Sequence, residues 1–75
     1  MKIRLSRHAK RRAKLYSIEE YMVINILKDM ELADGKHEIV REVAGLKFPL
    51  KIVVNVESDN VTVTTNYPVK KGKPK

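Results

Sequence analysis

The chain contains no cysteine and no tryptophan, and only one phenylalanine, three glycines and three prolines. The absence of cysteine excludes a disulfide framework, thiolate metal sites and thiol catalysis. The two histidines and the scattered carboxylates show no metal-ligand spacing, so we expect neither a metal nor a cofactor. So few large aromatic residues also argue against a surface on which the bases of a single strand stack.

Long apolar runs are absent as well. No stretch approaches the roughly 20 apolar residues of a membrane span, and the start "MKIRLSRHAK" lacks the apolar segment of a signal peptide. These features predict a cytoplasmic protein without membrane association. At 75 residues the chain has room for one domain. We expect residues 1–68 to form it and residues 69–75 to be a flexible basic tail.

Positive charge is abundant, and it is concentrated at both ends of the chain. The net charge is +7, and residues 1–16 hold seven Lys or Arg and no acid. Residues 17–34 hold five acids and one lysine, which gives a net charge of −4. Such a distribution predicts either nucleic-acid binding through phosphate contacts or a merely solubilising surface.

A short strand and two helices are predicted before residue 35. Residues 2–5 form the strand, and Ser6 is suited to cap the first helix. One apolar stripe along this helix has helical spacing: Leu5, Ala9, Ala13 and Tyr16. The segment "SIEE" is typical of a capping box, which predicts that Ser17 begins the second helix and that Gly35 ends it. This second helix has a wide apolar surface, formed by Ile18, Tyr21, Met22, Val23, Ile26, Leu27 and Met30.

After Gly35 the apolar residues alternate, which predicts strands over residues 36–43, 47–57 and 61–67. A two-residue turn at 44–45 and a loop at 57–60 set the register, so that Ile39 faces Leu50 and Ile52 faces Thr65. The face under the helices is then formed by Val43, Phe48, Leu50, Ile52, Val54, Val56, Val61 and Val63. The expected fold class is α+β, with two N-terminal helices packed on a three- to four-stranded antiparallel β-meander.

The predicted register puts three polar side chains on the helix-facing side of the sheet: Arg41, Thr65 and Tyr67. Arg41 is interpreted either as a phosphate clamp or as a structural side chain that passes Phe48 or pairs with an acid. Thr65 and Tyr67 are either phosphate ligands or simply residue types that favour strands. Nucleic-acid contacts are predicted for the cations away from the apolar stripe and in the tail: Arg7, Lys10, Arg11, Lys14, Lys70 and Lys71.

Two short motifs carry a resemblance to a known group of proteins. The helix motif "HAKRR" contains His8, Ala9 and Arg12, and the last strand reads "VTTNYPVK". In this order and separation they resemble a small family of uncharacterised domains in the RelE-like group, which unites barnase, EndoU, colicin nuclease domains and RelE toxins. The resemblance covers about residues 4–70. It implies a RelE-like fold, metal-independent ribonuclease activity, His8 as an acid–base group with Arg12 beside it, and a phosphate contact from a threonine of the last strand.

The residues themselves are compatible with this chemistry. Metal-free RNA cleavage needs a base, an acid and cations near the phosphorus, and an imidazole and guanidinium groups supply these functions. His8 and Arg12 are four residues apart and share a helix face. The structural alternative is that His8 borders the apolar stripe with its ring half buried.

We therefore expect an RNA-binding protein that acts as a metal-independent endoribonuclease, as the toxin half of a pair with an acidic antitoxin-like partner. The alternative is a non-catalytic module that binds nucleic acid or protein through the same basic helix. A third interpretation is a small domain whose charge only keeps it in solution.

Overall fold

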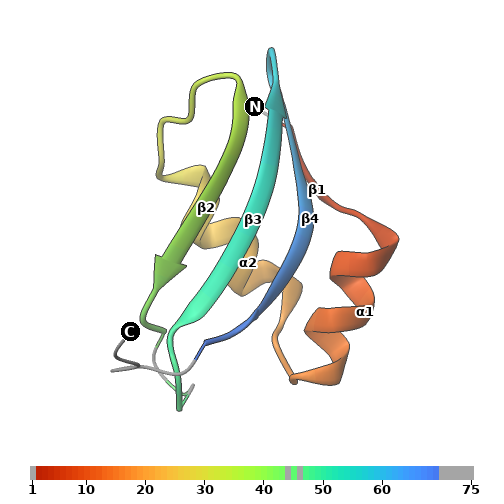
Figure 1. The fold of residues 1–75 in the computed structure, drawn as a ribbon, viewed down its shortest axis with the longest axis vertical. Coiled ribbons are helices and arrows are strands. Elements are labelled where there is room, and N and C mark those ends of the chain that lie inside the picture. The colour runs from red at the N-terminus through yellow and green to blue at the C-terminus, as the bar shows by residue number, and fades with distance from the viewer. Residues whose placement is uncertain (1, 44, 46, 70–75) are drawn as a thin grey trace.

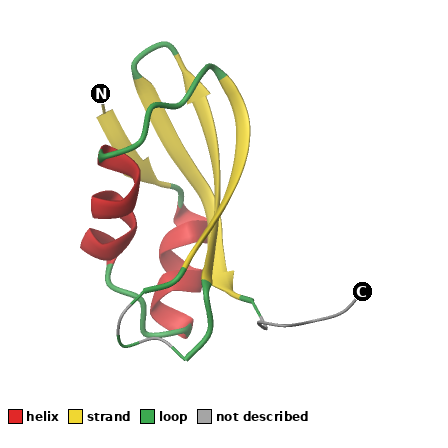
Figure 2. Ribbon diagram, turned by 90° about the vertical axis from the view of Figure 1, so that its left-hand side faces the viewer, coloured by secondary structure: helices red, strands yellow, loops and turns green. Residues whose placement is uncertain are grey.

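A mixed four-stranded sheet carries two helices on one face in the computed structural model, which describes residues 2–43, 45 and 47–69. The elements follow the order β1 (Lys2–Leu5), α1 (Arg7–Leu15), α2 (Glu20–Lys28), β2 (Gly35–Arg41), β3 (Leu50–Glu57) and β4 (Asn60–Pro68). Across the sheet the strand order is β1-β4-β3-β2 (Figure 1). Both helices lie on the same side of the sheet, and the other face is left uncovered by helices (Figure 2). The predicted α+β class is confirmed.

The strand β1 makes the sheet mixed. It runs parallel to β4, with Ile3 opposite Val61 and Leu5 opposite Val63, whereas β2, β3 and β4 are antiparallel neighbours. The three antiparallel strands of the predicted meander are present, but a sheet of antiparallel strands alone is not confirmed, because β1 makes the sheet mixed. The chain leaves β1 directly into α1, and β1 occupies the edge of β4 that no hairpin partner covers. The Ser6 N–H extends this pairing by donating to the Val63 carbonyl at 2.9 Å.

The core lies between the sheet and the helices. Six of the eight predicted face residues are buried, and Val43 and Phe48 are half-buried. The core also includes Leu5 of β1, Ile18 before α2 and Ile39 of β2, and the helices contribute Ala9, Ala13, Val23 and Leu27. Two tyrosines predicted on apolar helix faces do not join them, because Tyr16 is 38% exposed and Tyr21 is 63% exposed.

The connection between β2 and β3 is longer than predicted. Ile39 pairs with Ile52 rather than with Leu50, and Arg41 pairs with Leu50, so the register is shifted by two residues. An even shift keeps the same face inward, which is why the core prediction survives the error. The loop spans residues 42–49 instead of a two-residue turn, and its residues 44 and 46 lie outside the described ones. Pro49 has no N–H to donate, and the ladder begins directly after it.

The connection between β3 and β4 is tighter than predicted. Glu57 pairs with Asn60, so only Ser58 and Asp59 form the loop. Ser58 takes a φ of +55° at the first loop position. Asp34 fixes this hairpin to the segment before β2, since its Oδ1 accepts from the Ser58 N–H at 3.1 Å.

A β-bulge in β4 reverses which residues face the helices. The register is regular to the Val54–Val63 pair, but the next pair is Val53–Thr65, so Thr64 is an extra residue. The Thr64 hydroxyl donates to the Val53 carbonyl at 3.1 Å. Beyond the bulge Asn66 turns inward, where it is fully buried. The prediction that Thr65 and Tyr67 face the helices is therefore wrong.

The turn between the helices also differs from the prediction. Ser17 has a φ of +58° and follows α1 as its left-handed cap. Its N–H donates to the Lys14 carbonyl at 3.2 Å, and the Ile18 N–H donates to the Ala13 carbonyl at 2.7 Å. This pair of bonds defines a Schellman motif, so Ser17 ends α1 and does not begin α2. Residue Glu19 occupies the N-cap of α2, no side chain caps it, and α2 ends at Lys28, well before Gly35 in β2.

Candidate nucleic-acid interface

The position of α1 is set by polar contacts with β4. Ser6 caps the helix by accepting from the Ala9 N–H at 3.1 Å, and its hydroxyl donates to the Thr64 carbonyl at 3.1 Å. The buried Asn66 amide donates to the Ala9 carbonyl at 3.2 Å. Because Ala9 and Ala13 are the buried residues of α1, little side-chain bulk separates the helix from the sheet. The first helix is thus held along β4 with most of its circumference in solvent.

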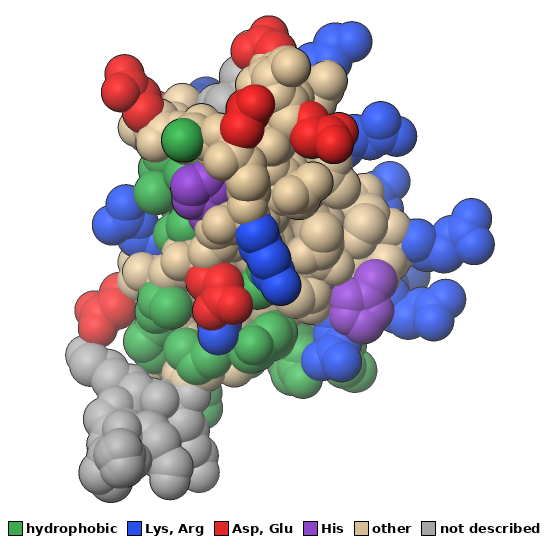
Figure 3. Space-filling model, turned by 45° about the horizontal axis from the view of Figure 1, so that its top comes forward, with side chains coloured by type: hydrophobic (Ala, Val, Ile, Leu, Met, Phe, Trp, Pro, Cys, Tyr) green, Lys and Arg blue, Asp and Glu red, His purple; other side chains and the backbone are tan. Residues whose placement is uncertain are grey.

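Cations are concentrated on β1 and α1, and we name this set of side chains the basic edge. It consists of Lys2, Arg4, Arg7, Lys10, Arg11, Arg12 and Lys14. All are exposed except Arg12, which is half-buried, and residues 1–16 contain no acid. Lys and Arg side chains gather on the right-hand side of the molecule in Figure 3, the side of α1 in Figure 1. This surface attracts polyanions.

The two flanks of α1 face different surroundings. Lys10 and Lys14 line a pocket together with residues of α2, so this flank of the helix is turned toward α2. His8 and Arg12 are four residues apart and lie on the opposite flank by helical geometry. His8 is exposed, and by helical geometry it borders the buried stripe of Ala9 and Ala13. The predicted pair of His8 and Arg12 does share one side of the helix.

Thr65 and Tyr67 lie on the sheet face that the helices leave uncovered. Tyr67 stands opposite Lys51, whose Nζ lies 3.1 Å from Oε1 of Glu38. The hydrogen bond with Glu38 raises the pKa of Lys51 above its ordinary value, the charge of Glu38 adds to this effect, and Tyr67 contributes further. Tyr67 therefore belongs to a small polar cluster on the uncovered face. The predicted meeting of Thr65 and Tyr67 with His8 on the helix-facing side does not occur.

Arg41 is on the helix-facing side, but at the other edge of the sheet. It ends β2, which is separated from β4 by β3, whereas α1 packs against β4. Its side chain is exposed, and within the described residues it pairs with no acid. Of the five predicted catalytic residues the structure thus keeps only His8 and Arg12 on one flank of α1. The predicted contacts Lys70 and Lys71 lie outside the described residues.

The second histidine has a structural contact. His37 is half-buried in β2, and its Nε2 donates to the Ala33 carbonyl at 2.6 Å. The bond fixes the segment before β2 against the strand. No group of three or more His, Cys, Asp or Glu side chains in the described part of the chain is placed to hold a metal ion. Among the helices of residues 2–43, 45 and 47–69, none is long and apolar enough to cross a membrane.

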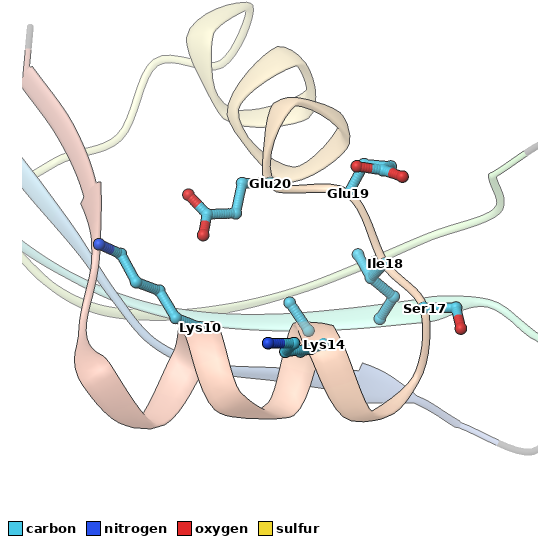
Figure 4. Close-up of a pocket in the computed structure, with 7 residues that line it drawn as sticks. Lys10, Lys14, Ser17, Ile18, Glu19 and Glu20 are labelled. Carbon is cyan, nitrogen blue, oxygen red and sulfur yellow. The ribbon is translucent and has the colours of Figure 1, made fainter.

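A pocket between the helices was not anticipated from the sequence. It has a volume of about 540 Å³ and lies between α1 and the start of α2. We name it the junction pocket, and its lining consists of Lys10, Ala13, Lys14, Ser17, Ile18, Glu19 and Glu20. Glu20 reaches from α2 toward α1, and Lys10 extends from α1 toward α2 (Figure 4). The "SIEE" segment gave no sign of it, because the positive φ of Ser17 that shapes the junction is not visible in the sequence.

Comparison with protein-family models finds no match, and comparisons with curated proteins and with solved structures find none either. The RelE-like resemblance carried by His8, Arg12 and the last strand therefore stays a prediction.

Proposed function

We propose that this protein binds RNA through the basic edge. The observation that carries the proposal is the concentration of seven cations on β1 and α1 without any acid among them. Six of these side chains are exposed, so their charged groups reach solvent and can contact phosphates without rearrangement of the fold. Phosphate contacts of this kind release counterions from the nucleic acid and supply most of the affinity of sequence-independent binding.

The test is the salt dependence of RNA binding. A fluorescent single-stranded RNA is titrated with the protein at a series of salt concentrations. We expect the logarithm of the binding constant to fall linearly with the logarithm of salt concentration, with a slope of about −0.7 for each phosphate contact. Alanine at Arg7, Arg11 or Lys14 should each make the slope shallower. An RNA binding constant that does not change with salt concentration would contradict the proposal.

Metal-independent RNA cleavage is a second candidate, in keeping with the RelE-like resemblance. It is favoured by one observation: His8 is exposed on the basic edge and shares a helix flank with Arg12. In this proposal the His8 imidazole takes the proton of the 2′-hydroxyl, and the 2′-oxygen forms a bond to phosphorus as the bond from phosphorus to the 5′-oxygen breaks. The leaving 5′-oxygen takes its proton from water, and Arg12 stabilises the charge that develops on the phosphate. Arg41, Thr65 and Tyr67 have no part in it, because they lie on other surfaces.

Cleavage is tested with mixed RNA in the presence of EDTA, by following product formation on a gel. We expect cleavage by the unaltered protein, none by the His8→Ala variant, and full cleavage by the His37→Ala control if that variant keeps the fold by circular dichroism. RNA affinity of the His8→Ala variant should stay nearly unchanged. A protein that binds RNA but leaves it intact under EDTA would be the non-catalytic binding module.

The predicted acidic, antitoxin-like partner remains a proposal of the same kind. Its support is again the basic edge, since the same guanidinium and ammonium groups attract an acidic protein segment and a phosphate backbone. Such a partner should compete with RNA. A partner that binds without displacing RNA would contradict this assignment.

A further inference from the structure

The junction pocket has a lining that phosphate binding alone does not account for. Lys10 and Lys14 line it from α1, whereas Glu19 and Glu20 line it from the start of α2. Within the described residues none of these four side chains forms an ion pair or a hydrogen bond. Two carboxylates are unfavourable in a pocket that binds only phosphate, because they repel the anion. Ala13 and Ile18, both buried, give the pocket an apolar part.

This combination of groups fits a nucleotide better than a free anion. A nucleobase has flat apolar faces and an edge with amino donors, and its phosphate is negative. A carboxylate accepts from the amino edge and the lysines suit the phosphate, while Ala13 and Ile18 form only a small apolar floor. The volume of about 540 Å³ is within the range of small-molecule pockets.

We propose that the junction pocket receives one unpaired base of the bound RNA, with its amino edge on the Glu20 carboxylate and the adjoining phosphate on Lys10 and Lys14. This inference rests on the proposed RNA binding and specifies its substrate as a single strand with a preference for amino-bearing bases. Cytosine presents a 4-amino group to the carboxylate. Uracil presents carbonyl oxygens on both sides of its one N–H, and a carboxylate repels them.

The experiment compares oligocytidylate and oligouridylate of ten nucleotides, which differ in the base edge but not in phosphate number. We expect the full chain to bind the cytidylate about fivefold to tenfold more tightly. In the Glu20→Gln variant the ratio should fall to about one, because an amide presents both a donor and an acceptor. Affinity for the uridylate should rise in this variant, since the carboxylate that repels its carbonyl oxygens is removed.

The matched control is Glu31→Gln, which removes an exposed carboxylate that does not line the pocket. It should raise affinity for both oligomers and leave their ratio unchanged. Equal binding of the two oligomers by the unaltered protein overturns the base site but leaves the proposed RNA binding intact. A ratio that survives Glu20→Gln also overturns it. Absence of binding to either oligomer at low salt overturns both proposals.

Discussion

At the scale of single residues, Ser17 shows how one backbone angle decides the junction of the helices. Its φ of +58° is costly for a residue with a Cβ, and glycine adopts this region freely. Replacement of Ser17 by glycine should therefore stabilise the protein by about 1 kcal/mol, measured as the free energy of unfolding in urea. Ser17→Ala keeps the Cβ and should bring no gain. A glycine variant no more stable than the alanine variant would contradict the left-handed cap.

A second residue-scale prediction concerns Lys51 on the uncovered sheet face. Glu38 raises the pKa of Lys51 above 10.5, its ordinary value, because the carboxylate favours the charged amine. A pKa raised by folding contributes stability that is fully present below the unfolded pKa and is lost as pH rises through the folded one. The stability difference between the unaltered protein and a Lys51→Met variant should therefore stay constant up to about pH 10 and shrink above it. Denaturant unfolding across pH 8–12 measures this difference in unfolding free energy. A difference that grows as the pH rises would contradict the prediction.

At the scale of elements, Ser6 joins β1, α1 and β4. Its hydroxyl oxygen accepts from the Ala9 N–H, and the hydroxyl itself donates to the Thr64 carbonyl. Ser6→Ala removes both bonds and should cost about 1–2 kcal/mol of stability. Ser6→Asp keeps the cap but has no proton to donate to the Thr64 carbonyl. Its stability should therefore lie between that of the unaltered protein and that of the Ser6→Ala variant. Equal stability of the aspartate and alanine variants would mean that the cap contributes nothing, and thermal or urea unfolding decides it.

Features that follow from hydrophobic periodicity were predicted from the sequence. The β-bulge, which depends on one extra residue in β4, was not. Alternation predicted the inward faces of β3 and the first half of β4, because a two-residue register error leaves the face unchanged. The bulge at Thr64 could not be predicted, since it depends on the Val53 carbonyl and on α1 packing against β4. That single insertion turned Asn66 inward and Tyr67 outward. It also separated Tyr67 and Thr65 from the predicted site, whereas His8 and Arg12 stayed together because helical spacing alone fixes them.

Asn66 illustrates the cost of this arrangement within the element. Its Nδ2 donates to the Ala9 carbonyl, but its fully buried Oδ1 has no hydrogen-bond partner in the described part of the chain. A buried polar atom without a partner is unfavourable. The amide thereby orients α1 on β4 at some expense of stability. Simple alternation from Val61 and Val63 puts position 66 on the face away from the helices, which explains why Asn66 was not anticipated in the core.

At the scale of the whole molecule, charge is separated between the two halves of the helical layer. The cations of the basic edge lie on β1 and α1, whereas residues 17–34, which include α2, have a net charge of −4. A polyanion should therefore approach from the side of α1 rather than along residues 17–34, whose acids flank a helix α2 that is itself neutral. Glu20 lies in the first turn of α2 and lines the junction pocket. It is the carboxylate that we propose to accept from the amino group of the base.

The location of the binding surface can be separated from the effect of net charge. Three alanines at Arg7, Arg11 and Lys14 lower the net charge from +7 to +4 (7 − 3 = 4), and so do three at Lys28, Lys36 and Lys47. All six side chains are exposed, but the second set lies outside the basic edge. If phosphates bind at α1, the first variant should lose about two units from the salt slope of single-stranded RNA binding, at about 0.7 per contact. The second variant should keep the slope of the unaltered protein. Equal losses in both variants would mean that RNA responds only to total charge, and the basic edge would then not be the binding surface.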